Sequence, residues 1–397
     1  MAVPILKTVR PRLVLMHRYS GLILSLVLFI AGLTGSICAF QDEIDAALNP
    51  DLFQAAHPDH LLPLSALLAR LKEQRPSEPI AVLMYRPQPG RSIEAFSSSD
   101  PSDEESPLQN EIFLDPSSGF IQGLRPAEGC CFNRRALMPF LYRVHYSLDL
   151  GKTGSWILGL SAILWTVDCL VGLILTFPLH PAAWKKDFWE RWGKAWTIAF
   201  GRSFIRLTFD LHRAISLWLW VILLGIAISG VALALGDEVF EPVVRAVLPT
   251  DSSEPPEQPQ TPLHAVIIDE AESIAAAFVQ SQGVHARPAA VLLAPDGSTA
   301  TFYLFSNSGA VPTGLGSPLI TVDMKTGRII SGEIPGKGAL GNLVLQLQFP
   351  WHSGEIAGLA GRIVICISGL AVCVLTVTGV MIWWRKRRLP PGRQKGL

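Results

Sequence analysis

Four long apolar runs constrain the fold of this chain more than any other feature of its sequence. They cover Tyr19–Phe40, Ser155–Leu179, Ala214–Leu235 and Ile363–Trp384. Each run has about the 20 residues that an α-helix needs to cross roughly 30 Å of hydrocarbon. Three of them contain no charged residue, and the second contains only Asp168. The sequence therefore predicts an α-helical integral membrane protein with four transmembrane helices in a lipid bilayer.

The distribution of basic residues predicts how these helices are oriented. Segments 1–18, 180–213 and 385–397 hold 17 of the 33 Lys and Arg residues but only three of the 33 acidic ones. Short basic segments stay on the cytoplasmic side of a membrane. We therefore expect a multi-pass protein of the bacterial inner membrane with both termini in the cytoplasm and the long segments in the periplasm. The equal totals of basic and acidic residues argue against a nucleic-acid partner.

The two halves of the sequence repeat one another, which predicts two tandem copies of one structural unit. The pairs His17-Arg18 and His212-Arg213 precede the first and third runs, and a glycine follows each histidine after 18 residues. His145 and His352 precede the second and fourth runs, and a glycine follows each after 27 residues. Each unit would consist of a helix, a small α+β periplasmic lobe and a second helix, with the two units related by an axis along the membrane normal.

Each long segment between the runs is predicted to form one of these lobes. Apolar residues at helical spacing predict amphipathic helices over Leu64–Gln74 and Ala265–Gln282. Short strands bounded by turn residues follow each helix, at 80–85, 93–96, 112–115 and 119–122, and at 290–293, 301–305, 320–323 and 327–331. The predicted organisation is a cytoplasmic N-terminus (1–18), helix one (19–40), lobe one (41–152), helix two (153–179), a basic cytoplasmic loop (180–211), helix three (212–235), lobe two (236–360), helix four (361–384) and a cytoplasmic tail (385–397).

Four of the nine histidines lie at the ends of the predicted transmembrane helices. His17 and His212 fall at cytoplasmic ends, whereas His145 and His352 fall at periplasmic ends, on short lead-in turns. Histidines of one unit are thus on opposite faces, so a two-histidine site has to form across units, His17 with His212 and His145 with His352. Two imidazoles that face each other between membrane helices are the arrangement that axially ligates b-type haem iron. The pattern therefore favours two haem b groups.

Arginines near both pairs could bind haem propionates, because a guanidinium binds carboxylates in a bidentate manner. The predicted partners are Arg18 and Arg213 at the inner pair and Arg143 at the outer pair. The further arginines near the two pairs are Arg10, Arg12, Arg202, Arg206, Arg134, Arg135 and Arg362. Taken one at a time, a His-Arg at a membrane boundary is also typical of an interfacial anchor. His180 is a competing ligand for the inner pair.

These residues resemble the PepSY-associated transmembrane proteins. The resemblance is carried by Leu15-Met-His17-Arg18-Tyr-Ser-Gly-Leu22, by Arg143-Val-His145-Tyr-Ser-Leu148, by Leu211-His212-Arg213 and by Trp351-His352. It covers essentially the whole chain and is greatest to inner-membrane ferrisiderophore reductases of the FoxB type. The resemblance implies a di-haem protein that carries electrons to ferric siderophores, with His17, His145, His212 and His352 as ligands and PepSY-like modules as the periplasmic lobes.

Two other features remain open. Asp168 lies near the middle of helix two, where an ionised carboxylate costs about 2.5–3.5 kcal/mol. A proton or quinol role and a hydrogen-bonded packing role are both compatible with it, and its counterpart in the second unit is Leu375. Cys130 and Cys131 are adjacent, and two ordinary buried thiols are expected there because no third or fourth metal ligand accompanies them.

The predicted function is that of an oxidoreductase, a haem-dependent ferrisiderophore reductase. Electrons would come from a quinol or an unidentified cytoplasmic donor and leave to ferric siderophore in the periplasm. No nucleotide-binding fingerprint is present, so the chain has no NAD(P)H domain of its own. A transporter is disfavoured because four unbroken spans leave little room for alternating access. The alternative is a membrane-anchored PepSY-like module that binds peptide, peptidase or siderophore without redox activity.

Overall fold

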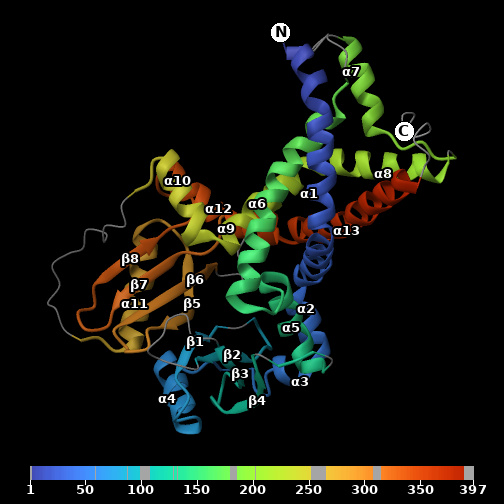
Figure 1. The fold of residues 1–397 in the computed structure, drawn as a ribbon. Coiled ribbons are helices and arrows are strands. Elements are labelled where there is room, and N and C mark those ends of the chain that lie inside the picture. Colours follow the sequence, from blue (N-terminus) through green and yellow to red (C-terminus); the bar gives the residue numbers. More distant parts are fainter. Residues whose placement is uncertain are drawn as a thin grey trace.

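The computed structural model shows a bundle of helices beside a single β-sheet (Figure 1). It describes residues 2–58, 60–86, 88–98, 108–127, 129–131, 133–178, 186–201, 203–251, 265–306 and 314–388. The α-helices are α1 (Ala2–Cys38), α2 (Gln41–Leu48), α3 (Pro50–Phe53), α4 (Leu64–Gln74), α5 (Arg134–Ser147), α6 (Gly151–Thr176), α7 (Lys186–Gly193), α8 (Phe204–Trp218), α9 (Trp220–Ala234), α10 (Glu241–Val247), α11 (Ile268–Ser281), α12 (Leu340–Ser353) and α13 (Gly358–Arg388). The strands are β1 (Ile80–Met84), β2 (Ile93–Ser98), β3 (Leu108–Leu114), β4 (Ile121–Pro126), β5 (Ala286–Leu293), β6 (Thr299–Ser306), β7 (Leu319–Asp323) and β8 (Ile329–Glu333).

Three described helical segments are long and apolar enough to cross a membrane. They are Thr8–Cys38 within α1, Gly151–Thr176 (α6) and Glu355–Arg388, which adds a short 3-10 turn to α13. Large apolar side chains on these helices are exposed, with Ile23 at 72% and Leu160 at 56% of full exposure. Hydrocarbon solvates such side chains, whereas water does not. The helices of this protein therefore suit a membrane.

The third predicted span differs from expectation because it is broken. Residues 204–234 form α8 and α9, which meet at Leu219 and are bent by 71° relative to each other. The bent pair counts as a fourth span only if the two helices cross together. The expectation that no helix is broken, which was one reason to disfavour a transporter, is therefore wrong for this run.

The strands of both predicted lobes form one antiparallel sheet with the order β4-β3-β2-β1-β5-β6-β7-β8. All eight strands lie close to their predicted positions. The two lobes are nevertheless not separate, because β1 pairs with β5 through Val82 opposite Leu292 and Leu83 opposite Val291. Leu83 and Val291 are fully buried. The backbone N–H and C=O groups of an unpaired edge strand are prone to pair with another strand. Here β1 of the first lobe and β5 of the second lobe pair with each other.

Helices α4 and α11 pack on this sheet and complete one hydrophobic core. Leu64, Leu67 and Leu71 recur at helical spacing on α4, and Ala271, Ala275 and Val279 recur on α11. The hydroxyl of Ser65 donates to Asp269 Oδ2 at 2.5 Å, which ties the first turn of α4 to the first turn of α11. The core is therefore shared by residues from both halves of the chain.

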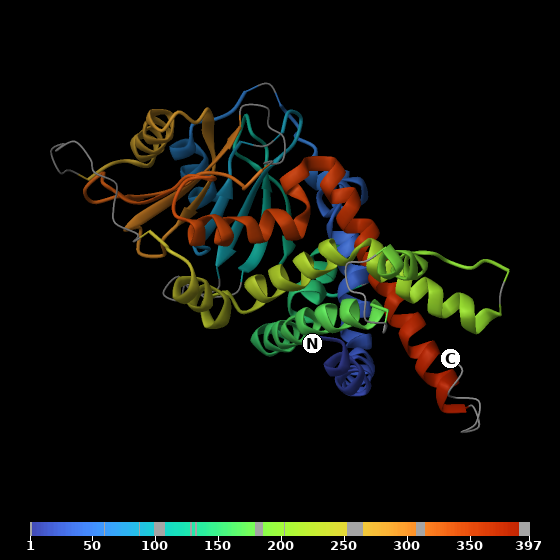
Figure 2. The same ribbon diagram turned by 90° about the horizontal axis from the view of Figure 1, so that it is seen from above.

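A buried ion-pair network connects the sheet to the helical bundle. Arg125 on β4 donates through Nη1 and Nη2 to both oxygens of Asp45 on α2, at 3.0 and 2.7 Å. Its Nε donates to Glu111 on β3 at 2.6 Å. All three side chains are less than 10% exposed. Because α2 directly follows α1, this network fixes the sheet against the end of the first span, and Figure 2 shows the sheet to one side of the bundle with both chain ends on the helical side.

The cysteines differ from expectation at one place. Cys130 and Cys131 are joined as a disulfide between neighbours, so the expectation of two free thiols is wrong. Cys38, Cys169, Cys366 and Cys373 are free, and each is half-buried within or beside a span.

Candidate functional site

The four histidines expected to form a site lie in two close pairs. The ring centres of His17 and His212 are 6.2 Å apart, and those of His145 and His352 are 6.1 Å apart. His17 is on α1 and His212 is on α8, whereas His145 and His352 are on α5 and α12. The last two helices have 14 residues each, so the outer histidines stand on full helices rather than on the short turns expected.

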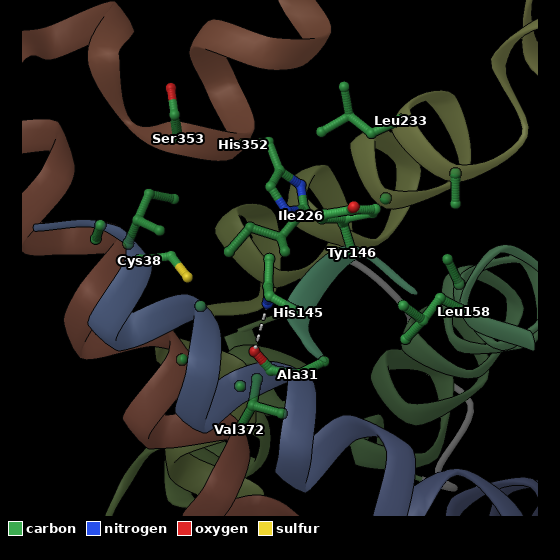
Figure 3. A pocket seen from close by; sticks show the side chains of 18 of the residues that line it. Ala31, Cys38, His145, Tyr146, Leu158, Ile226, Leu233, His352, Ser353 and Val372 are labelled. Carbon is green, nitrogen blue, oxygen red and sulfur yellow. Dashed lines mark hydrogen bonds between the residues drawn. The ribbon is translucent and has the colours of Figure 1, made fainter. Parts of the chain in front are cut away.

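The rings of the outer pair are held through their Nδ1 atoms. His145 Nδ1 lies 3.1 Å from the carbonyl oxygen of Ala31 on α1 (Figure 3). It also lies 3.2 Å from the hydroxyl of Thr34 on the same helix. His352 Nδ1 lies 2.8 Å from the hydroxyl of Ser229 on α9. Burial lowers the pKa of His145 and lowers that of His352 to about 3. Burial thus favours the neutral form of both rings, which is the form of imidazole that binds a metal.

The rings of the inner pair are held in the same way but by different chemistry. His212 Nδ1 lies 3.0 Å from the hydroxyl of Thr378 on α13. His17 Nδ1 lies 3.0 Å from each carboxylate oxygen of Asp168 on α6. Asp168 also accepts a 2.5 Å hydrogen bond from the hydroxyl of Ser20 and is only 7% exposed. In the described part of the chain all four rings thus make their hydrogen bonds through Nδ1, which leaves Nε2 as the nitrogen for a ligand.

A glycine of a neighbouring helix faces the Cε1 atom of each ring. A Cβ atom added at these glycines would lie 2.7 Å from His145 Cε1 at Gly35, 3.3 Å from His212 Cε1 at Gly379, 3.5 Å from His17 Cε1 at Gly172 and 4.0 Å from His352 Cε1 at Gly230. Real Cβ atoms almost never lie closer than 3.0 Å to another heavy atom, so a larger residue at position 35 would displace the His145 ring. These four glycines therefore leave the space that the histidine rings occupy, and we call Gly35, Gly172, Gly230 and Gly379 the seat glycines.

Comparison with protein families gives one match. Residues 14–386 match the model of the PepSY-associated TM region, which spans all four histidines. The chain belongs to the PepSY-associated transmembrane family. No curated protein matches its sequence.

This PepSY-associated protein has a close helix crossing beside the outer pair. A Cβ atom at Gly32 of α1 would lie 2.8 Å from the carbonyl oxygen of Gly369 on α13. The hydroxyl of Ser36 donates to the carbonyl oxygen of Cys366 at 2.9 Å across the same contact. Small residues at helix crossings allow backbones to approach in this way. The crossing holds the first and last spans together next to the outer histidines.

A cavity of about 560 Å³ lies between the helices at the outer pair. Its size is within the range of about 300–1,000 Å³ typical of ligand and cofactor pockets. His145 and His352 both line it, and Figure 3 shows their two rings next to each other among apolar side chains such as Leu158, Leu233 and Val372. The site is therefore a mostly apolar slot into which two imidazoles project.

Charged residues gather on one part of the cavity wall, where Asp42, Glu355 and Arg362 line it. Arg362 Nη2 pairs with Glu43 at 2.6 Å, and its Nε donates to the carbonyl oxygen of Ala39 at 2.8 Å. Burial raises the pKa of Asp42. Among the residues that line the cavity, Arg362 is thus the one Lys or Arg side chain, and it is only 13% exposed.

The arginines singled out in the sequence lie differently from expectation. Arg143 pairs with Asp149 and donates to the carbonyl oxygens of Ala127 and Gly129, and it is not among the residues that line the outer cavity. Arg213 pairs with Asp210 and donates to the carbonyl oxygen of Ala195. Arg18 is half-buried on α1, next to His17 in the chain. Arg362, which the sequence placed only in the wider set, is the one that lines the cavity, whereas Arg202 and His180 lie outside the described residues.

Sequence reasoning missed the Nδ1 partners of the rings. Thr34, Ser229 and Thr378 each directly precede one of the seat glycines, so a hydroxyl followed by glycine was a signal that could have found all three. Asp168 had no such signal. Among the described residues, no group of three or more His, Cys, Asp and Glu side chains could hold a metal ion by itself.

Proposed function

We propose that this protein is a di-haem b electron-transfer protein that reduces ferric siderophore, so that the iron is released. One haem would be held by His17 and His212 and the other by His145 and His352. When bound between two imidazoles, haem iron takes up and gives away one electron at a time. Ferric iron is held tightly by the hard oxygen ligands of siderophores and ferrous iron is held far less tightly, so one electron loosens the chelate.

The spacing of the rings carries this proposal. A metal ion between two imidazoles, with metal–nitrogen bonds of about 2 Å on each side, holds the ring centres roughly 6 Å apart. The observed separations are 6.2 and 6.1 Å. A haem needs only two ligands from the protein because the porphyrin supplies the other four. Two isolated histidine pairs at this distance are therefore compatible with haem.

The hydrogen bonds of the rings also suit this role. A histidine that binds a metal through one nitrogen almost always donates its other N–H to a carboxylate, carbonyl or water, which fixes its tautomer and orientation. His17 and His145 have a carboxylate and a carbonyl oxygen at Nδ1, and His212 and His352 have a hydroxyl oxygen there. Thr34, Ser229 and Thr378 would orient their rings, Gly35 and its counterparts would admit them, and the apolar cavity wall would exclude water from the outer pair.

We infer further that the chain is a tandem repeat. The contact of His17 with Gly172 has its counterpart in the contact of His212 with Gly379, and the contact of His145 with Gly35 has its counterpart in the contact of His352 with Gly230. Corresponding positions keep a constant spacing between the halves: His17 and His212, like Gly35 and Gly230, are 195 residues apart, whereas His145 and His352, like Gly172 and Gly379, are 207 residues apart. Each proposed site combines one histidine from each half, so neither half could bind haem alone.

The direction of transfer follows from the surroundings of the two pairs. His145 and His352 lie on helices that connect the sheet with α6 and α13, next to the cavity. A bulky chelate would dock at that end, which we assign to the periplasm. Quinol or a cytoplasmic donor would deliver electrons at the inner pair, next to the basic segments at both chain ends.

The proposal is tested by reoxidation of the reduced protein. Full-length protein in detergent is reduced with dithionite, freed of excess reductant and mixed with ferric siderophore or with the same siderophore loaded with redox-inert gallium. We expect the ferric chelate to reoxidise the protein, with one ferrous ion for each electron lost, and the gallium chelate to leave it reduced. Reoxidation by neither chelate would contradict the proposal, and a protein without haem that binds both would support the binding-module alternative.

A further inference from the structure

The four histidine rings are held alike except for one. His145, His212 and His352 have neutral partners at Nδ1, a hydroxyl in each case and for His145 also a carbonyl oxygen. His17 instead has the carboxylate of Asp168, with both oxygens at 3.0 Å. This difference is confined to one ring of the inner pair.

The local sequence of α6 explains why a carboxylate occupies this place. On α1, α9 and α13 the hydroxyl partner directly precedes the seat glycine. On α6 the residue before Gly172 is Val171, which has no hydrogen-bonding group. Asp168 lies four residues before Gly172, one helical turn away, on the same face of the helix. The carboxylate therefore supplies the acceptor that Val171 lacks.

Asp168 has few other interactions that would account for it. It is 7% exposed and lies within a predicted span, where an ionised side chain is costly. Its partners in the described part of the chain are the His17 ring and the hydroxyl of Ser20 on the same helix, α1. No Lys or Arg side chain of the described residues forms an ion pair with it. A buried carboxylate at this position thus acts mainly on His17.

A carboxylate that accepts the N–H of a metal-bound imidazole makes that imidazole a stronger electron donor to the metal. Stronger donation favours the oxidised metal, and hydrogen bonding to the axial ligand is one of the means by which a protein sets the potential of its haem. A hydroxyl or carbonyl acceptor polarises the ring less because it carries no full charge.

We propose that Asp168 is a positioning residue that lowers the midpoint potential of the inner site, His17 with His212, below that of the outer site, His145 with His352. The inference rests on the proposed function, since it requires haem at both pairs. A lower potential at the inner site makes electron transfer within the protein directional. The favoured transfer moves one electron from the inner to the outer site, with no bond broken and with the Nδ1 proton retained on His17.

The test is a spectroelectrochemical titration of full-length protein in detergent. Asp168→Asn keeps the shape and an acceptor oxygen but removes the charge. We expect it to raise the midpoint potential of the inner site alone, so that the equilibrium constant for inner-to-outer transfer falls at least tenfold, which corresponds to about 59 mV for one electron. The matched control is Thr166→Val on the same helix, whose hydroxyl donates to the carbonyl oxygen of Ala162 and to neither histidine pair, and it should leave that constant unchanged.

A second measurement covers the case in which Asp168→Asn loses the inner haem. The protein with His352→Ala retains only the inner site and the protein with His17→Ala retains only the outer one, so each potential is measured separately. The inner site should titrate at the lower potential, with at least a tenfold difference in the equilibrium constant. Equal potentials, the reverse order, or an Asp168→Asn protein with both haems and an unchanged inner potential would overturn the inference while leaving the proposed function intact. Wild-type protein without any haem would refute the proposed function itself.

Discussion

The inner and outer histidine pairs have nearly the same geometry but different surroundings. Their ring centres are 6.2 and 6.1 Å apart, and all four rings are held through Nδ1. The outer pair lines a cavity of about 560 Å³ and has only neutral partners, whereas the inner pair includes the buried carboxylate of Asp168. The difference teaches that two sites of one molecule can share the same ring spacing while the charge beside the rings and the cavity around them differ.

The largest effects are expected from the histidines themselves. His17→Ala or His212→Ala should each remove the same half of the bound haem, and His145→Ala or His352→Ala should each remove the other half. The two substitutions within a pair should not add, because one lost ligand already breaks a two-histidine site. Haem content per polypeptide measures this. If His17→Ala and His145→Ala removed the same haem, the pairing in both sites would be wrong.

The seat glycines provide a sharper comparison within the outer pair. A Cβ atom at Gly35 would lie 2.7 Å from His145 Cε1, whereas one at Gly230 would lie 4.0 Å from His352 Cε1. Overpacking of this kind costs about 1–3 kcal/mol. Gly35→Ala should therefore lower haem retention at the outer pair by about tenfold or more, and Gly230→Ala, the matched control, should change it little. Equal losses in both variants, measured by haem release to an apo-globin acceptor, would argue against the ring positions.

The sequence predicted which histidines lie together because the basic segments place His17 and His212 on one face of the membrane and His145 and His352 on the other. The role of Asp168 could not be predicted, since it depends on the register of α1 against α6, which a single sequence does not contain. The contacts of Arg143 could not be predicted from the sequence either. Its charge suggested a cofactor contact, but Asp149 and two backbone carbonyl oxygens occupy its guanidinium.

The fold shows the same division between local and long-range information. Each strand was predictable from local alternation and turn residues. The joining of two lobes into one sheet was not, because Leu83 and Val291 pair across some 200 residues of chain. The bend at Leu219 was also missed, since the run 214–235 is continuous in hydropathy and contains no proline that would announce a break.

A rise in pH should lower the stability of the sheet without affecting the inner histidine pair. Burial, together with Glu111 and Asp42, raises the pKa of Glu94 on β2 from 4.5 to about 8. A carboxyl group with a raised folded-state pKa stabilises the fold below its unfolded pKa and loses that contribution as the pH rises through the folded value. As the pH rises from about 4.5 to 8, the free energy of unfolding should therefore decrease by up to about 1.4 kcal/mol per pH unit, and the thermal unfolding midpoint should decrease with it.

The Glu94→Gln protein is the control for this effect, because it cannot ionise at that position. Its unfolding midpoint should vary much less over the same pH range, and haem at the inner pair should show no corresponding loss. A wild-type midpoint that rises with pH over this range would contradict the assignment of Glu94.

The smallest effect is expected from the arginine of the outer cavity. Arg362 lines the cavity but is already paired with Glu43 at 2.6 Å, which reduces its influence. Removing a positive charge near a haem favours its oxidised state, so Arg362→Gln should lower the midpoint potential of the outer site. The equilibrium constant for inner-to-outer electron transfer should then fall about threefold. Arg143→Gln, at a residue that does not line the cavity, should leave both potentials unchanged. A larger shift in Arg143→Gln than in Arg362→Gln would reverse the roles assigned to the two arginines.

The central claim is that each histidine pair holds one haem b, and it is tested most directly by the haem content of wild-type protein. Full-length protein is expressed with sufficient haem supply and purified in detergent, and haem b is quantified as its pyridine complex against polypeptide determined by amino-acid analysis. The account predicts two haem b groups per chain and a reduced spectrum typical of bis-histidine ligation. Colourless protein would contradict it, and a content of one haem per chain would show that only one of the two pairs is a haem site.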